Sequence, residues 1–142
     1  MNVADEIVSK SNGARFHRAD LHIHSFGGSH DVKDMSMTAA GILQTADREN
    51  LTLVSITDHN EITNVLGAIE LSKGRPVSVI AGIELSTPQG HLLAYFPDYD
   101  RLANFYGRLQ FEGKGTPESR CQTSLLDCLS LASSMSGIVG AR

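Results

Sequence analysis

The sequence predicts an α/β protein in which helices connect strands that run in parallel. Runs of β-favouring apolar residues alternate along the chain with segments of helical periodicity. Histidines and carboxylate side chains lie where those apolar runs begin or end. This alternation is typical of a barrel or of an open doubly wound sheet. Only about five strands can be counted, which is too few for a closed barrel of eight.

The first part of the chain is expected to form a strand, a helix and a second strand. Residues 20–25 alternate polar and apolar side chains, as a half-buried strand does, and the polar, glycine-rich segment 26–31 is expected to be a loop. Apolar residues at helical spacing predict a helix over 39–50. The β-favouring run 51–57 then predicts the return strand. The two candidate N-caps of the helix are Ser36 and Thr38.

The middle of the chain continues the pattern. A helix is expected over 62–72, where a glycine and then a proline follow its last turn. Residues 77–84 are apolar on both faces, as in a parallel strand that is covered on each side. Turn-forming residues fill 86–90, and the apolar run 91–96 predicts another strand.

The last third is expected to be mainly helical. Asp98 or Asp100 can cap a helix that reaches about residue 109. The glycine-containing segment 112–117 predicts a flexible loop, and a further helix is expected over 123–135.

Composition bounds the class of protein. The 142 residues suit one globular domain, with 41% hydrophobic and 20% charged residues. The net charge is −4, and the sequence shows no basic stripe that could bind nucleic-acid phosphates. If nucleic acid is a substrate, bound metal ions would have to supply the positive charge at the site. The N-terminal residues lack a basic segment followed by an apolar stretch, and no apolar run is long enough for a bilayer. We therefore expect a cytoplasmic protein without a membrane partner.

Two cysteines, Cys121 and Cys128, fall in or near the last expected helix. Two turns of helix separate their Cα atoms by roughly 10 Å, which exceeds the reach of a disulfide, about 7 Å. They are predicted to be buried free thiols on one helical face.

The strand over 20–25 carries the most informative pattern. Because side chains alternate on a strand, Asp20, His22 and His24 point to one side, while Leu21 and Ile23 point to the other. A strand presents two metal ligands in this way.

Further histidines and acids cluster at the ends of other expected strands. Thr57-Asp58-His59-Asn60 follows one apolar run, Gly82-Ile83-Glu84 ends the next, and His91 opens a third. The carboxyl ends of parallel strands form the functional site of many α/β folds. Imidazoles with carboxylates and no nearby cysteine suit Zn, Mn or Fe. Five of the six histidines lie in or beside these clusters: His22, His24, His30, His59 and His91.

These motifs, in this order, resemble the polymerase and histidinol phosphatase (PHP) superfamily of metal-dependent phosphoesterases. The resemblance covers residues from about 20 to 96, through Asp20–Ser25, Ile56–Asn60, Gly82–Glu84 and His91. It implies a distorted (β/α)7 barrel with parallel strands, which holds two or three ions of Mn, Zn or Fe at the strand ends. More weakly, residues 26–34 are similar to PHP modules that precede ATPase regions in larger bacterial proteins.

The resemblance also implies roles for individual side chains. His22 and His24 would hold one metal ion, and Glu84 would bridge it to a second ion that His91 also binds. A third site would involve His59 and His30, with Asp31 competing for the place of His30. Two carboxylates, Asp58 and Asp20, are expected to orient ligating imidazoles. The expected catalytic carboxylates are thus Glu84, Asp58 and Asp20.

The chain departs from the family pattern at its end. Residues 137–141 look like a strand that finishes in Ala-His in the family, but Arg142 stands at the place of that histidine. The later ligands of the family, a histidine and an Asp-x-His pair, do not follow. We expect an N-terminal arm over 1–18 and a PHP-like domain over 19–142 that is either an amino-terminal piece of a longer protein or a shortened member. A C-terminal continuation or a partner domain would then supply the missing ligands.

Two functional hypotheses follow. The first is a metal-dependent phosphoesterase that acts on a phosphomonoester, or on a nucleotide or nucleic-acid phosphodiester, through a di- or trinuclear site. No serine or cysteine triad competes, because Ser25 and His24 are strand neighbours and face opposite ways. The second is a non-catalytic PHP-like scaffold or regulatory module of a larger protein.

Overall fold

Two three-stranded sheets share one continuous stretch of extended chain. The computed structural model describes residues 16–141. Strand β3 (Ser78–Val79) is separated by a single residue from β4 (Ala81–Thr87), yet β3 belongs to the first sheet and β4 to the second. The stretch 78–87 therefore carries the chain from one sheet into the other.

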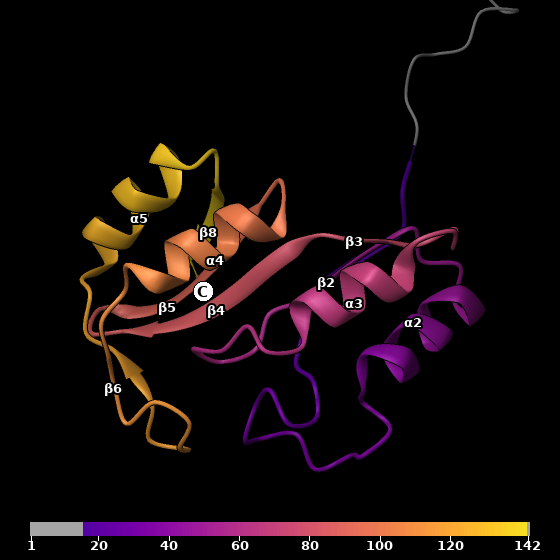
Figure 1. Cartoon of the computed structure of the whole chain (residues 1–142), viewed down its shortest axis with the longest axis horizontal. Helices are drawn as coiled ribbons and strands as arrows, with labels where there is room; N and C mark the ends of the chain where they lie inside the picture. Colours follow the sequence, from indigo (N-terminus) through magenta and orange to yellow (C-terminus); the bar gives the residue numbers. More distant parts are fainter. Residues whose placement is uncertain (1–15, 142) are drawn as a thin grey trace, which may run out of the picture.

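The first sheet is parallel, in the order β1-β2-β3. It contains β1 (Ala19–Ile23) and β2 (Leu53–Ile56), with β3 at its edge. Helices α2 (Ala39–Arg48) and α3 (Val65–Ser72) connect its strands and lie beside the sheet in Figure 1. Small apolar clusters around Leu43 and Ile42 fill the space between these helices and the strands. This half has the strand, helix, strand order that the sequence predicts.

The second sheet is antiparallel, in the order β4-β5-β8, and here the expectation of parallel strands is wrong. Strand β5 (Gly90–Phe96) pairs with β4 from Thr87↔Gly90 to Ala81↔Phe96, so only two residues form the turn. A parallel crossover needs a dozen or more residues, so this turn permits only antiparallel pairing. Strand β8 (Ile138–Ala141) adds to the free edge of β5.

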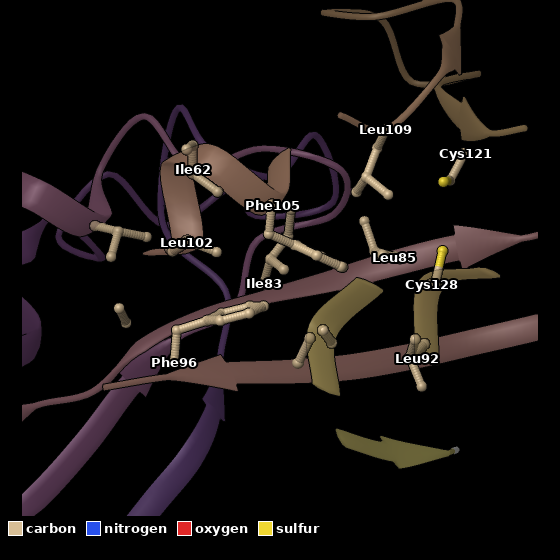
Figure 2. Packing of buried hydrophobic residues seen from close by; sticks show 14 residues of the cluster. Ile62, Ile83, Leu85, Leu92, Phe96, Leu102, Phe105, Leu109, Cys121 and Cys128 are labelled. Carbon is tan, nitrogen blue, oxygen red and sulfur yellow. The ribbon is translucent and has the colours of Figure 1, made fainter. Parts of the chain in front are cut away.

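The larger core packs against the antiparallel sheet. Helices α4 (Tyr99–Gly107) and α5 (Leu125–Ser134) lie over this sheet in Figure 1. Figure 2 shows how Leu102 and Phe105 of α4 meet Ile83 of β4 and Phe96 of β5. Odd-numbered residues of β4 point into this core, and even-numbered residues such as Glu84 face the other way.

The helix starts agree with cap chemistry. Thr38 caps α2 by accepting a hydrogen bond from the N–H of Gly41, and Asp98 caps α4 by accepting one from Arg101. Ser124 caps α5. Of the two candidate caps at each of the first two sites, the structure thus selects Thr38 and Asp98.

A short hairpin replaces part of the expected flexible loop. Strands β6 (Phe111–Glu112) and β7 (Arg120–Cys121) pair antiparallel, with residues 113–119 between them. Cys121 therefore lies on a strand rather than in the last helix, which begins at Leu125. Both thiols are free and buried, as expected. Figure 2 shows the sulfur atoms of Cys121 and Cys128 pointing toward each other, so the premise that one helix keeps them apart is wrong.

The expectations of a distorted barrel, an N-terminal arm and the absence of a membrane span remain to be compared with the structure. The described strands form two sheets and a hairpin, and the implied seven-stranded barrel remains a prediction. Most of the expected arm over 1–18 lies outside the described residues. Within residues 16–141, no helix is both long enough and apolar enough to cross a membrane.

Candidate metal centre

Glu84 lies at the centre of a cluster of imidazoles on the seam between the two sheets. Its side chain is 0% exposed. Nε2 of His22 and Nε2 of His24 lie 2.7 and 2.8 Å from the same oxygen, Oε2. Nδ1 of His91 lies 2.7 Å from the other oxygen, Oε1. Both carboxylate oxygens are thus contacted, from β1 and its end on one side and from β5 on the other.

Backbone pairing explains why these side chains converge. His22 and His24 alternate with Leu21 and Ile23, so both imidazoles leave β1 on one side. Beyond the end of β2, the chain pairs with β4, where Glu84 N–H donates to Asp58 O (3.1 Å) and Asn60 N–H donates to Glu84 O (2.8 Å). This bridge places His59 beside Glu84.

His59 occupies the space between Glu84 and the loop after β1. Its Nδ1 lies 3.7 Å from Glu84 Oε2, and its Nε2 lies 3.7 Å from Asp31 Oδ2. Among the described residues, buried Nδ1 has no hydrogen-bond partner. Burial lowers the pKa of His59, which favours the neutral imidazole that can bind a metal. An orphaned ring nitrogen that faces a carboxylate fits a metal ligand.

The loop after β1 contributes Asp31 rather than His30. Asp31 Oδ2 lies 3.2 Å from His24 Nδ1. His30 is exposed and belongs to none of the three-residue ligand groups found in the described part of the chain. Of the two alternatives that the sequence left open, the geometry favours Asp31.

The site contains three overlapping groups of three residues, and within each group the possible ligand atoms lie within 4.8 Å of one another. Burial alone would raise the pKa of Glu84, but hydrogen bonds from three imidazoles outweigh burial and lower this pKa to about 2. Glu84 is therefore an anion, and the donor set of imidazoles and carboxylates fits a divalent ion such as Zn, Mn or Fe. The groups are His22, His24 and Glu84; His24, Asp31 and His59; and His59, Glu84 and His91.

The structure places the two other predicted carboxylates differently. Asp58 is buried, and its oxygens accept hydrogen bonds from the Ser25 N–H, the Ser25 hydroxyl and the Ser29 hydroxyl. Asp58 thus anchors the loop after β1, and among the hydrogen bonds observed it accepts none from the imidazole of its neighbour His59. Asp20 is exposed, and it accepts from the backbone N–H of His22 rather than from the imidazole (3.2 Å).

Sequence reasoning missed Asn60. Its Oδ1 accepts from Ser86 N–H (2.9 Å) and its Nδ2 donates to Ser119 O (3.0 Å), so one amide joins β4 to the β6–β7 hairpin. Asn60 has φ of 54°, a left-handed conformation that asparagine tolerates better than most residues. An asparagine directly after a histidine at a strand end was the available signal.

A pocket of about 400 Å³ opens beside the cluster. Its lining includes His59 and His91, with His30 and Asp31. The β6–β7 hairpin also lines it, through Ser119 and Arg120 among others. A small molecule has room to enter here.

Comparison with solved structures bears on the fold. The chain matches a two-domain protein of Bacteroides vulgatus that contains a predicted PHP-like metal-dependent phosphoesterase, with a TM-score of 0.60 and 17% identity over 87% of this chain and 34% of that chain. The chain has a PHP-like fold. The resemblance carried by the sequence motifs is thus confirmed at the level of the backbone, and so is the α/β class.

Other comparisons are partial. No protein-family model matches the sequence. An uncharacterized protein of Methanocaldococcus jannaschii is 33% identical over 89 residues, which are 58% of this chain and 52% of that protein. The chain therefore spans about half the length of this relative.

Two more solved structures align with TM-scores of 0.49, which add nothing to the PHP-like assignment. One is an amidohydrolase from Chromobacterium violaceum, with 24% identity over 63% of this chain and 32% of that chain. The other is a proposed metal-dependent phosphoesterase from Bifidobacterium adolescentis, with 21% identity over 64% and 32%.

Proposed function

We propose that this chain holds a divalent-metal centre that hydrolyses phosphoesters. The observation that carries the proposal is the position of Glu84, a buried carboxylate whose two oxygens face imidazoles from different strands. A buried carboxylate is costly unless charged partners compensate it. The imidazoles lower the pKa of this carboxyl group to about 2, so Glu84 is an anion that can bind divalent cations together with them.

The ligand groups suggest how the ions would be distributed. His22 and His24 would hold one ion with Oε2 of Glu84, and His91 and His59 would hold a second ion with the same carboxylate. A third ion would be held by Asp31 together with His24 and His59. Both of these histidines also belong to another group. In this assignment Glu84 is the bridge.

The residues of the chain prepare the reaction. When bound, the ions would supply an activated water and positive charge for the phosphoryl oxygens. The two strand ends fix the imidazoles before substrate arrives, which avoids reorganisation during the reaction. Asp58 holds the loop that carries Asp31 through its contacts with Ser25 and Ser29.

The substrate is proposed to be a phosphomonoester, or a nucleotide or nucleic-acid phosphodiester. The net charge of −4 gives no general attraction for polyanions. Recognition would therefore depend on the metal ions and on the pocket of about 400 Å³ beside them. A further segment or partner domain that completes the ligand set is part of this proposal.

Metal content and turnover together test the proposal. The full chain is purified, reconstituted separately with Mn, Zn and Fe, and assayed with p-nitrophenyl phosphate and its bis-ester. Elemental analysis is expected to give more than one ion per chain. Glu84→Gln should lower metal content to below one ion and turnover by at least about 100-fold, because it removes the charge shared by two ion positions. Glu70→Gln, on an exposed surface of α3, is the matched control and should change neither value.

Two outcomes would contradict the proposal. Normal turnover in Glu84→Gln would remove Glu84 from the reaction. A well-folded wild-type chain with less than one ion would favour the non-catalytic scaffold instead.

A further inference from the structure

The pocket beside the imidazoles is also lined by a residue whose buried hydroxyl lacks a partner. Ser119 is 8% exposed. Its Oγ has no hydrogen-bond partner among the described residues, and the residue lines the pocket beside the metal centre. Buried polar groups are nearly always hydrogen-bonded, and an exception calls for an explanation such as a ligand. The next residue, Arg120, lines the same pocket.

We propose that Ser119 and Arg120 form a binding site for the phosphoryl oxygens of the substrate, in the pocket that His59 and His91 also line. The inference rests on the proposed function and adds to it the residues that select a phosphoryl group. Neither residue belongs to any of the candidate ligand groups.

The backbone around Ser119 is held in place. Asn60 Nδ2 donates to Ser119 O (3.0 Å), and Nη1 of Arg120 donates to the same oxygen (2.7 Å). Ser119 N–H donates to Thr116 O (3.1 Å). The carbonyl and the N–H of Ser119 are thus engaged while its hydroxyl is left for a ligand. Because Asn60 also accepts from Ser86 of β4, the hairpin is tied to the strand that carries Glu84.

The chemistry of these two residues suits an anion. Arg120 is the only lysine or arginine among the residues that line the pocket. A guanidinium has five N–H donors in a planar fork, and the observed contact with Ser119 O uses one of its nitrogens. A serine hydroxyl adds one more donor. Phosphoryl oxygens only accept hydrogen bonds, so two donor side chains favour them over an uncharged carboxamide, which also presents N–H groups.

Binding of inorganic phosphate to the full chain, reconstituted with Mn, tests the inference. Isothermal titration calorimetry gives Kd for wild type and for Arg120→Ala, Arg120→Lys and Ser119→Ala. Arg120→Ala should raise Kd by about tenfold or more, and Ser119→Ala by about three- to tenfold. Arg120→Lys should fall between wild type and Arg120→Ala, because lysine keeps the charge but not the fork. Arg48→Ala and Ser130→Ala, both at exposed helical positions, are the matched controls and should leave Kd unchanged.

Thermal unfolding separates binding from folding. Ser119→Ala deletes a hydroxyl without a partner, so the phosphate-free melting temperature should stay equal or rise, whereas the rise on adding phosphate should shrink. With p-nitrophenyl phosphate, Arg120→Ala should raise KM, and metal content should stay at the wild-type value in every variant.

The outcomes distinguish this inference from the proposed function. An unchanged phosphate Kd in Arg120→Ala or in Ser119→Ala would overturn the role of that residue, whether or not the chain is an enzyme. Weaker phosphate binding in both variants, in a chain that binds metal but turns over no ester, would support the anion site and contradict phosphoester hydrolysis.

Discussion

At the scale of single residues, Asp58 holds the loop beside the candidate metal centre without belonging to any of the candidate ligand groups. Burial raises its pKa, while the hydrogen bonds from Ser25 and Ser29 act in the opposite direction. Those donors belong to the loop that delivers Asp31 to the imidazoles. Asp58 is therefore a positioning residue for the loop.

Asp58→Asn should reduce the free energy of unfolding by more than it reduces the free energy of metal binding. The amide keeps the size of the side chain but loses the negative charge and one of the two acceptor oxygens that serve three donors. We expect a loss of about 1–3 kcal/mol in the free energy of unfolding, measured by urea denaturation. Asp47→Asn breaks a surface ion pair with Arg75 and is the control, with an expected loss below about 1 kcal/mol. Equal effects of the two substitutions would contradict the anchoring role.

Gly28 makes the close approach of the loop to Asp58 possible. A Cβ atom at this position would lie 1.9 Å from Asp58 Oδ2 and 2.7 Å from Ser25 Oγ. Gly28→Ala should therefore displace the loop, lower the melting temperature by several degrees and weaken metal binding. The matched control is Gly67→Ala in α3, where a Cβ meets nothing within 4 Å and alanine should stabilise the helix by up to about 1 kcal/mol. Differential scanning calorimetry and metal titration of both variants provide the comparison.

At the scale of elements, local patterns predicted most helices and strands and the parallel pairing of the first sheet, but missed the antiparallel pairing of the second. Thr38 and Asp98 cap helices at expected positions because capping depends on a few neighbouring residues. The direction of β5 depends on a two-residue turn, and the run of turn-forming residues made that connection look longer. Cys121 was assigned to a helix because it lies just before the helical pattern that contains Cys128.

The candidate site could be predicted in part for the same reason. The imidazoles and Glu84 have distinctive chemistry at strand ends, and the structure brings His22, His24, His59, His91 and Glu84 together. The choice of Asp31 over His30 depends on the course of a loop. The amide bridge of Asn60 depends on a hairpin far along the chain, which no local pattern reveals.

Asn60 connects two elements, so its removal should loosen one of them. Asn60→Gly keeps the left-handed backbone accessible and deletes both amide contacts. Amide hydrogen exchange in residues 111–121 should become faster, while metal content stays near the wild-type value. Asn104→Gly on α4, which contacts only Arg108 among the side-chain hydrogen bonds observed, should leave exchange in the hairpin unchanged. Unaltered exchange in Asn60→Gly would show that the amide does not hold the hairpin.

At the scale of the whole molecule, the candidate metal centre draws its side chains from two halves, each built around one sheet. Two small apolar clusters pack α2 and α3 on the parallel sheet, and the larger core packs α4 and α5 on the antiparallel sheet and also includes Val65 of α3. His22 and His24 belong to the first half, and Glu84 and His91 to the second. Ions shared by these ligands would link the halves.

Metal binding should therefore stabilise the entire domain. At a free metal concentration of about 100 times Kd, a single bound ion adds about 2.7 kcal/mol to the free energy of unfolding. Calorimetry should show one sharper transition at higher temperature with Mn, and a lower or broader one with a chelator. Glu84→Gln should show no such shift, and a metal-induced shift of wild-type size in this variant would contradict the bridging role.

The alternation of side chains along the stretch 78–87 makes its length important. Ile83 and Leu85 occupy the apolar core while Glu84 faces the imidazoles, so inserting or deleting one codon upstream of Glu84 would swap the two sets. An aliphatic side chain would then enter the ion cavity, and a carboxylate would lie among Leu102 and Phe105. A change in the length of this strand would therefore disturb the packing of the core and the candidate site at once.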